Sequence, residues 1–174
     1  MAIDKIQSES INLADNFAFT GTVTGAGESN SPYFTAYNSG NQTGFSNDTI
    51  TVMAMNTALQ NASEYNTSNY RFTPQTAGKF YLWNVVHLVS LDNTGFTAVC
   101  QIRKNGSAIA NTYPAISTEG MSERFRQCSV STACVESANG SSDYFDFTFG
   151  LSVSSGSNYY LGTGSRTGGF LLKT

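Results

Sequence analysis

The sequence predicts an all-β fold for most of the chain, and its composition is the first reason. Only 12% of the 174 residues are charged, about half the usual share, while 13% are aromatic. Long surface helices and coiled coils need many Glu, Lys, Arg and Leu residues, so this composition excludes them. Nine Lys and Arg residues against 12 Asp and Glu residues leave no basic surface for nucleic acid. No apolar stretch approaches the roughly 18 residues that cross a membrane.

The first 27 residues form a candidate N-terminal attachment arm, and residues 28–174 form the domain that follows it. Residues 17–24 (FAFTGTVT) alternate as in a strand, and Gly25 and Gly27 make a flexible joint. The arm needs a neighbouring subunit to bury its apolar side chains; the alternative is that it lies on its own domain as an extra strand. The polar start is unlike a secretory signal, so we expect synthesis in a cytosol. We expect the attachment to use Ile11, Leu13, Phe17 and Phe19.

The remainder of the chain alternates short strand-like runs with turn clusters. Asn105-Gly106 predicts a tight hairpin turn, because Asn and Gly tolerate the positive φ angles of such turns, and Asn139-Gly140 predicts a further turn. Many short strands with regular turn signals indicate a sandwich, a jelly roll or a barrel. The predicted strands cover residues 32–37, 50–55, 70–73, 79–91, 96–103, 128–136, 144–153 and 168–173.

The run FYLWNVVHLV over residues 80–89 is apolar on both faces of a strand. One face carries Phe80, Leu82, Asn84, Val86 and Leu88. The opposite face carries Tyr81, Trp83, Val85, His87 and Val89. A sandwich strand normally exposes one face to water, so the second face needs cover. A self-complementary oligomer would supply it, with Tyr81, Trp83, Val85 and His87 in the interface; the alternative is cover by long loops.

We find no motif that predicts catalysis, a cofactor or a metal site, and we expect the protein not to be an enzyme. His87 is the single histidine, and it lies in the middle of an apolar run. The Gly-rich stretch 162–169 lacks the Gly-Lys-Ser/Thr ending of a phosphate-binding loop. Glu136, Asp143 and Asp146 carry oxygen ligands suited to calcium, but we interpret them as solvated turn carboxylates.

The three cysteines do not predict a disulfide framework, because their number is odd. Cys128 and Cys134 would lie roughly 20 Å apart on one extended strand, beyond the reach of a bridge. We interpret these two residues and Cys100 as small buried hydrophobic side chains.

Six aromatic residues in or near the predicted loops are candidates for glycan binding, which needs aromatic platforms beside polar groups. The same residues would also serve as ordinary packing at strand ends. They are Tyr33, Tyr37, Phe45, Tyr113, Tyr159 and Tyr160.

Residues 65–89 (YNTSNYRFTPQTAGKFYLWNVVHLV) resemble the central signature of the tumour-necrosis-factor-like jelly roll, in the branch of the globular head of the first complement component. That signature is a Phe-Thr-Pro, a spaced Gly and a run of alternating aromatic residues. The hairpin IRKNGSAI at 102–109 and the closing strand TGGFLLKT at 167–174 are similar to two further marks of this family. The region ESANGSSDYFDF departs from the acidic-glycine hairpin of the family, so a family calcium site is not carried over. The resemblance implies a jelly-roll sandwich of two antiparallel sheets, assembled as a homotrimer.

The opening residues (IDKIQSESINLADNFAFTGTVTGAG) resemble the start of virion proteins of tailed bacteriophages. This second resemblance implies a virion structural protein that is assembled in the host bacterial cytoplasm. The first hypothesis is a trimeric decoration or cement protein, held on the major capsid protein by its N-terminal arm. The alternative is a receptor-binding module at the tail or at a fibre tip that contacts host surface glycans.

Overall fold

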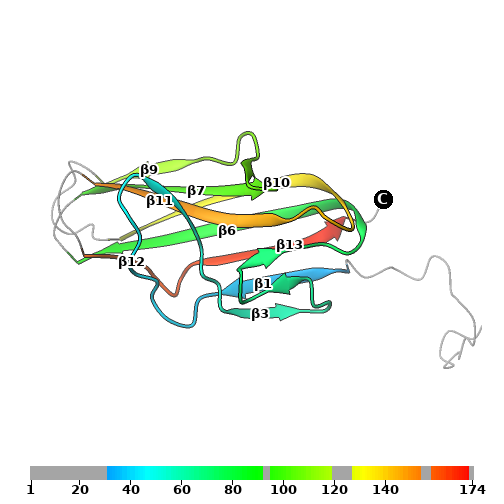
Figure 1. Ribbon diagram of the computed structural model, residues 1–174. Coiled ribbons are helices and arrows are strands. Elements are labelled where there is room, and N and C mark those ends of the chain that lie inside the picture. The colour runs from blue at the N-terminus through cyan, green and yellow to red at the C-terminus, as the bar shows by residue number, and fades with distance from the viewer. Residues whose placement is uncertain (1–30, 92–94, 119–126, 154–157, 173–174) are drawn as a thin grey trace, which may run out of the picture.

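Two antiparallel β-sheets make up the computed structural model, which describes residues 31–91, 95–118, 127–153 and 158–172. The described residues form thirteen strands and no helix, so the all-β prediction is confirmed. It follows that no membrane-crossing helix occurs among them. Figure 1 shows the sheets stacked face to face, with the strands running along the length of the sandwich.

Sheet A has the strand order β10-β6-β13-β1-β3, and β12 also pairs with β6. All of its pairings are antiparallel, and β6 pairs with β10 along nearly its whole length. The strands are β1 (Tyr33–Tyr37), β3 (Thr57–Gln60), β6 (Ala77–Ser90), β10 (Gln127–Asn139), β12 (Tyr159–Leu161) and β13 (Arg166–Leu172).

Sheet B has the order β4-β5-β11-β7-β8, with β2 paired to β11 and β9 paired to β7. Its longest pairing joins β11 and β7 over nine residue pairs. The strands are β2 (Thr49–Val52), β4 (Tyr65–Asn66), β5 (Arg71–Phe72), β7 (Phe96–Lys104), β8 (Ser107–Ala108), β9 (Ala115–Ser117) and β11 (Phe145–Val153).

The core lies between the sheets and is rich in phenylalanine. Phe72 of β5 is fully buried and stacks on Phe34, with ring centroids 4.4 Å apart. It also meets Phe80 edge to face at 5.5 Å. Burying one such side chain contributes about 1.5 to 3 kcal/mol. The inward alternation of β6 is the one that the sequence predicts, with Phe80, Leu82, Asn84, Val86 and Leu88 all buried.

Asn84 is the polar member of that inward row, and it connects the two sheets. Its Nδ2 donates hydrogen bonds to the carbonyl oxygens of Gln101 (3.2 Å) and Thr148 (3.0 Å), which are paired residues of β7 and β11. These bonds offset the cost of burying the Nδ2 group, whereas Asn84 Oδ1 is buried without a hydrogen-bond partner among the described residues.

The predicted strands are confirmed in position, with shifted ends and two shortened runs, one of which is 70–73, where β5 covers only Arg71–Phe72. Residues 50–55 were expected to be one strand, but β2 ends at Val52. Met53 and Met55 are fully buried without continuing the strand, because the Met55 N–H bonds to the Met53 carbonyl in a local turn. The hairpin at Asn105-Gly106 is confirmed, with φ of 51° and 79°. Short strands that the sequence did not indicate are β3, β4, β8, β9 and β12.

Candidate functional site

The outward side of sheet A carries most of its large side chains in three rows that cross the strands. These side chains share one face because directly paired residues of antiparallel strands point to the same side. The first row is Tyr33, Phe170, Tyr81 and Val135; the second is Leu59, Thr35, Gly168, Trp83 and Ala133; the third is Thr57, Tyr37, Arg166, Val85 and Ser131. We call these three rows the aromatic face.

The aromatic face is largely apolar, and the single chain leaves it partly exposed. Tyr33, Leu59 and Val135 have exposed fractions of 49%, 66% and 53%. Tyr81 and Phe170 pack against each other with ring centroids 5.4 Å apart. Arg166 is the one charged residue in the three rows, and its guanidinium lies over the ring of Tyr37 at 5.4 Å. Exposed apolar surface of this kind marks an interaction site more often than a monomer surface.

Glycines of the closing segment make room for the large side chains of β6. A Cβ on Gly168 would lie 2.5 Å from the Trp83 ring, so the indole rests directly on the backbone of β13. A Cβ on Gly162 would likewise lie 2.7 Å from the His87 ring, and one on Gly164 would lie 3.2 Å from it. The Gly-rich stretch therefore shapes the outer surface of sheet A.

The four residues predicted for the oligomer interface all lie on the outer side of β6. Tyr81, Trp83, Val85 and His87 are half-buried in the single chain. His87 Nδ1 lies 3.0 Å from Ser129 Oγ on the neighbouring strand β10. A catalytic histidine needs an orienting carboxylate on its second nitrogen, and none is bonded to His87 in the part of the chain that the structure describes. Burial of the four residues against other copies stays a prediction.

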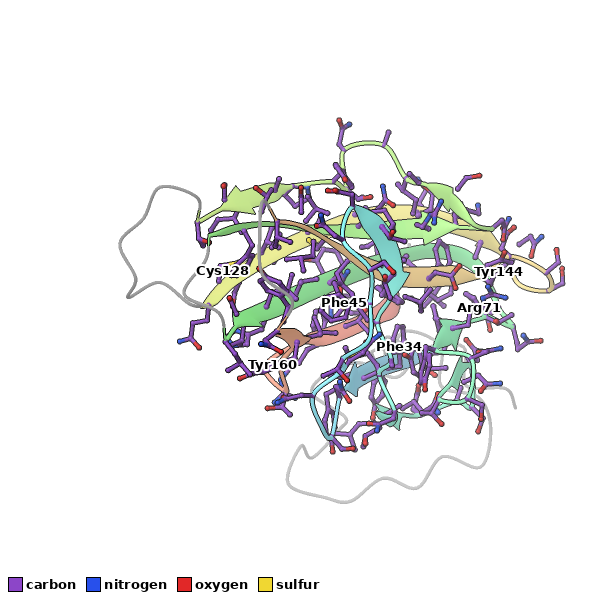
Figure 2. All side chains as sticks on the ribbon, turned by 60° about the vertical axis from the view of Figure 1, so that its left-hand side comes forward. Phe34, Phe45, Arg71, Cys128, Tyr144 and Tyr160 are labelled. Carbon is purple, nitrogen blue, oxygen red and sulfur yellow. The ribbon has the colours of Figure 1, made fainter. Side chains whose placement is uncertain are left out.

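The acidic residues considered for calcium are paired with cations: Asp146 with Arg71, and both Asp143 and Glu136 with Lys104. Asp146 is buried on the outer side of sheet B, where Arg71 Nε bonds to its Oδ1 at 2.8 Å. Arg71 also lies over the ring of Tyr144 at 3.9 Å, and Figure 2 shows the two together at one end of the sandwich. Lys104 Nζ lies 3.3 Å from Asp143 and 3.6 Å from Glu136. Across the described ranges, no three metal-ligating side chains converge.

All three cysteines are free thiols that pack against the core. Burial raises the pKa of Cys100 to about 12. It raises the pKa values of Cys128 and Cys134 to about 11. Because the thiolate is the reactive form, these residues act as hydrophobic side chains at neutral pH.

The six aromatic residues considered for glycan binding lie in four different places. Tyr33 and Tyr37 belong to the aromatic face. Phe45 and Tyr159 pack edge to face on the core rings Phe149 (4.8 Å) and Phe96 (6.1 Å). Tyr160 lies on β12, paired with Val89. Tyr113 lies on the loop before β9 with 53% of its surface exposed.

Sequence reasoning missed the residues that neighbouring strands add to the aromatic face: Tyr33, Leu59, Val135 and Phe170. Strand pairing brings them beside Tyr81 and Trp83, and no local pattern encodes that pairing. The expected attachment residues Ile11, Leu13, Phe17 and Phe19 lie outside the described residues.

The chain matches no protein-family model and no curated protein. Its structure is similar to the globular domain of the zebrafish complement 1qA protein, with a TM-score of 0.50 and 15% identity over 82% of this chain and 97% of that one. Eiger TNF from S. frugiperda gives a TM-score of 0.50 and 12% identity over 82% of this chain and 91% of that one. Murine APRIL gives 0.51 and 11%, over 81% and 98%. Likeness at these identities shows the fold: a jelly roll of the TNF and complement globular-head type.

Proposed function

We propose that this protein is a structural component of a bacteriophage virion: a homotrimer of jelly rolls that decorates the capsid and is attached through residues 1–27. Its role is mechanical and not enzymatic. The observation that supports the assembly is the aromatic face, which a single chain leaves exposed. The resemblance of the opening residues to phage virion proteins supports the location.

Burying the aromatic face between copies stabilises the assembly through the hydrophobic effect. A large apolar side chain moved fully out of water contributes about 1.5 to 3 kcal/mol. Tyr33, Leu59 and Val135 expose 49%, 66% and 53% of their surface in the single chain, so burying them between copies would add a large part of that contribution. A cyclic trimer closes on itself, which limits the assembly to three subunits.

The place where the arm joins the domain suits an attachment to a shell. The described chain begins at Ser31, and the Leu171 N–H bonds to the Pro32 carbonyl at 3.0 Å, so the arm joins beside the end of the last strand. Cyclic symmetry brings the three equivalent junctions to one level along the axis. Three arms can then engage the same shell together, and each can be weak while the trimer is held firmly.

Light scattering on the full chain tests the assembly. We expect a mass near three times the 18.7 kDa of one chain at micromolar concentration. A monomer mass would contradict the proposal, and a stable dimer would contradict the three-fold arrangement.

Immunogold electron microscopy on intact virions of the source phage tests the location. We expect gold over the whole head, with a matched preparation from which antibody is omitted as the control. Gold confined to the tail would contradict capsid decoration and would indicate a role in host recognition or tail assembly. No gold on the virion would overturn the proposal.

A further inference from the structure

A second candidate site lies on the outer side of sheet B, across the sandwich from the aromatic face. It is a hollow of about 250 Å³ between β2, β11 and β7. Gly150 lies at its base, where a Cβ would come within 2.7 Å of Val99 and 2.8 Å of Ile50. These two side chains therefore close over the glycine and give the hollow an apolar floor. We call it the β2–β11–β7 hollow; its lining is completed by Asp48, Thr49, Thr97, Tyr113, Leu151 and Ser152.

One wall of the hollow is aromatic, and its rim is polar. Tyr113 lines the hollow, and about half of its total surface is exposed. Asp48, Thr97 and Ser152 carry a carboxylate and two hydroxyl groups around the same opening. A small number of polar groups around an apolar floor is the usual composition of a small-ligand site.

The carboxylate at the rim is held in place before any ligand arrives. The Asp48 N–H bonds to the Leu151 carbonyl at 2.8 Å. Asn47 Nδ2 donates to Asp48 Oδ2 at 3.0 Å. The Asn47 side chain is itself bonded to β11: its Oδ1 accepts from the Val153 N–H at 2.8 Å, and its Nδ2 donates to the Val153 carbonyl at 3.2 Å. Holding a polar group in advance lowers the entropic cost of binding.

The charge of the lining selects among ligand classes. Asp48 is the one charged residue that lines the hollow, so the site disfavours phosphates and acidic sugars. A neutral pyranose ring has an apolar face of C–H groups that can lie on Tyr113, and a rim of hydroxyls that can donate to Asp48. The volume of the hollow is enough for one such ring.

We propose that the β2–β11–β7 hollow binds the ring of a neutral saccharide. Tyr113 stacks on the sugar, Asp48 accepts hydrogen bonds from its hydroxyls, and Thr97 and Ser152 contact the remaining edge. The inference stands on the geometry of sheet B and does not depend on the trimer or on the virion location.

Titration of the ¹⁵N-labelled full chain tests the proposal, with methyl β-D-galactopyranoside, methyl β-D-glucopyranoside and N-acetylglucosamine as probes. We expect at least one probe to give saturable shifts at the amides of Ile50, Val99 and Gly150, with a Kd on the order of millimolar for so small a ligand. Methyl β-D-glucuronide is the charge control and should bind more weakly than the glucopyranoside. Saturable shifts for none of the three neutral probes, or shifts only elsewhere, would overturn the proposal.

Substitutions at two exposed residues of the hollow, Tyr113 and Asp48, test whether the sugar binds there. Tyr113→Ala should weaken the responsive probe at least about tenfold through the lost stacking, and Asp48→Asn should reduce the preference for the neutral sugar over the glucuronide. Tyr70→Ala, on a half-buried tyrosine outside the hollow, is the matched control and should leave the Kd unchanged. An unchanged Kd in Tyr113→Ala would contradict the proposed site even if a probe binds.

Discussion

At the scale of single residues, the polar groups near the β10–β11 turn are closely bonded to one another. Asp143 accepts a hydrogen bond from Asn105 Nδ2 at 2.8 Å and one from the Asn139 N–H at 3.0 Å. Lys104 lies beside it. The hydrogen bond from Asn105, helped by Asn139 and Lys104, lowers the pKa of Asp143 below its ordinary value of 3.8. The turn that joins β10 to β11 is thereby connected to the turn that joins β7 to β8.

Asp143→Asn should make the free energy of unfolding less dependent on pH in the acid range. A carboxyl whose pKa is lowered by folding stabilises the native state above its unfolded value of 3.8, and that stabilisation is lost as the pH falls through the folded value. The variant should therefore be less stable than the parent chain at pH 7, with the difference shrinking once the pH falls below 3.8. Urea denaturation across this range measures it.

Asp48→Asn is the control for that series, because Asp48 is an exposed acid bonded to one side-chain amide. A constant difference between Asp143→Asn and the parent chain at every pH would show that the carboxylate charge of Asp143 does not contribute.

At the scale of elements, the glycines of the two Asn-Gly pairs have similar φ angles but different surroundings. Gly106 has φ of 79° and Gly140 has φ of 72°, both in the left-handed region. A Cβ on Gly106 would meet only the Tyr144 hydroxyl, at 3.6 Å. A Cβ on Gly140 would overlap the backbone of Thr76 and Ala77 at the start of β6. The second turn is therefore packed against the start of β6.

The pair Gly106→Ala and Gly140→Ala separates the dihedral cost from the packing cost. Gly106→Ala should lower the free energy of unfolding by about 1 to 2 kcal/mol, the cost of a left-handed alanine. Gly140→Ala should lower it by about 2 to 5 kcal/mol, since the backbone contact adds strain to the same dihedral cost. Equal losses in urea denaturation would show that the β10–β11 turn can move away from β6.

At the scale of the whole molecule, one sandwich has two different outer sides. Sheet A exposes the aromatic face, whereas the outer side of sheet B carries the ion pair between half-exposed Arg71 and buried Asp146, and the β2–β11–β7 hollow. Assembly through sheet A would leave sheet B exposed to the medium. The two proposals therefore use opposite sides of the sandwich and are compatible.

Trp83→Asp should abolish the trimer without unfolding the chain. The indole lies on the outer side of β6 and rests on Gly168, so a carboxylate there meets water in the monomer but would be buried without a partner in the trimer. Light scattering should report a monomer, and circular dichroism should still report β-structure. Ile116→Asp, on an exposed apolar residue of β9, is the control and should remain trimeric. A trimer that survives Trp83→Asp would contradict an interface at the aromatic face.

The sequence by itself determined the fold class, the main strands and the two faces of β6. These features are local: alternation along one strand decides which side chains share a face, and an Asn-Gly pair favours a tight turn wherever it lies. The strands that it missed have two to four residues each, too few for a period to be visible. The jelly-roll resemblance rested on three local motifs, and the structural likeness supports it.

Only the tertiary structure decided which strands lie side by side, and with that the composition of both surface sites. The aromatic face joins Tyr33 to Phe170 and Tyr81, and the hollow joins Ile50 to Gly150 and Val99. These residues are distant in the sequence and meet through backbone hydrogen bonds, which leave no mark on residue type. The same holds for Asn84 in the core. The alternation of β6 predicts that Asn84 points inward, but only the packing of the two sheets brings the carbonyl oxygens of Gln101 and Thr148 within hydrogen-bond distance of it.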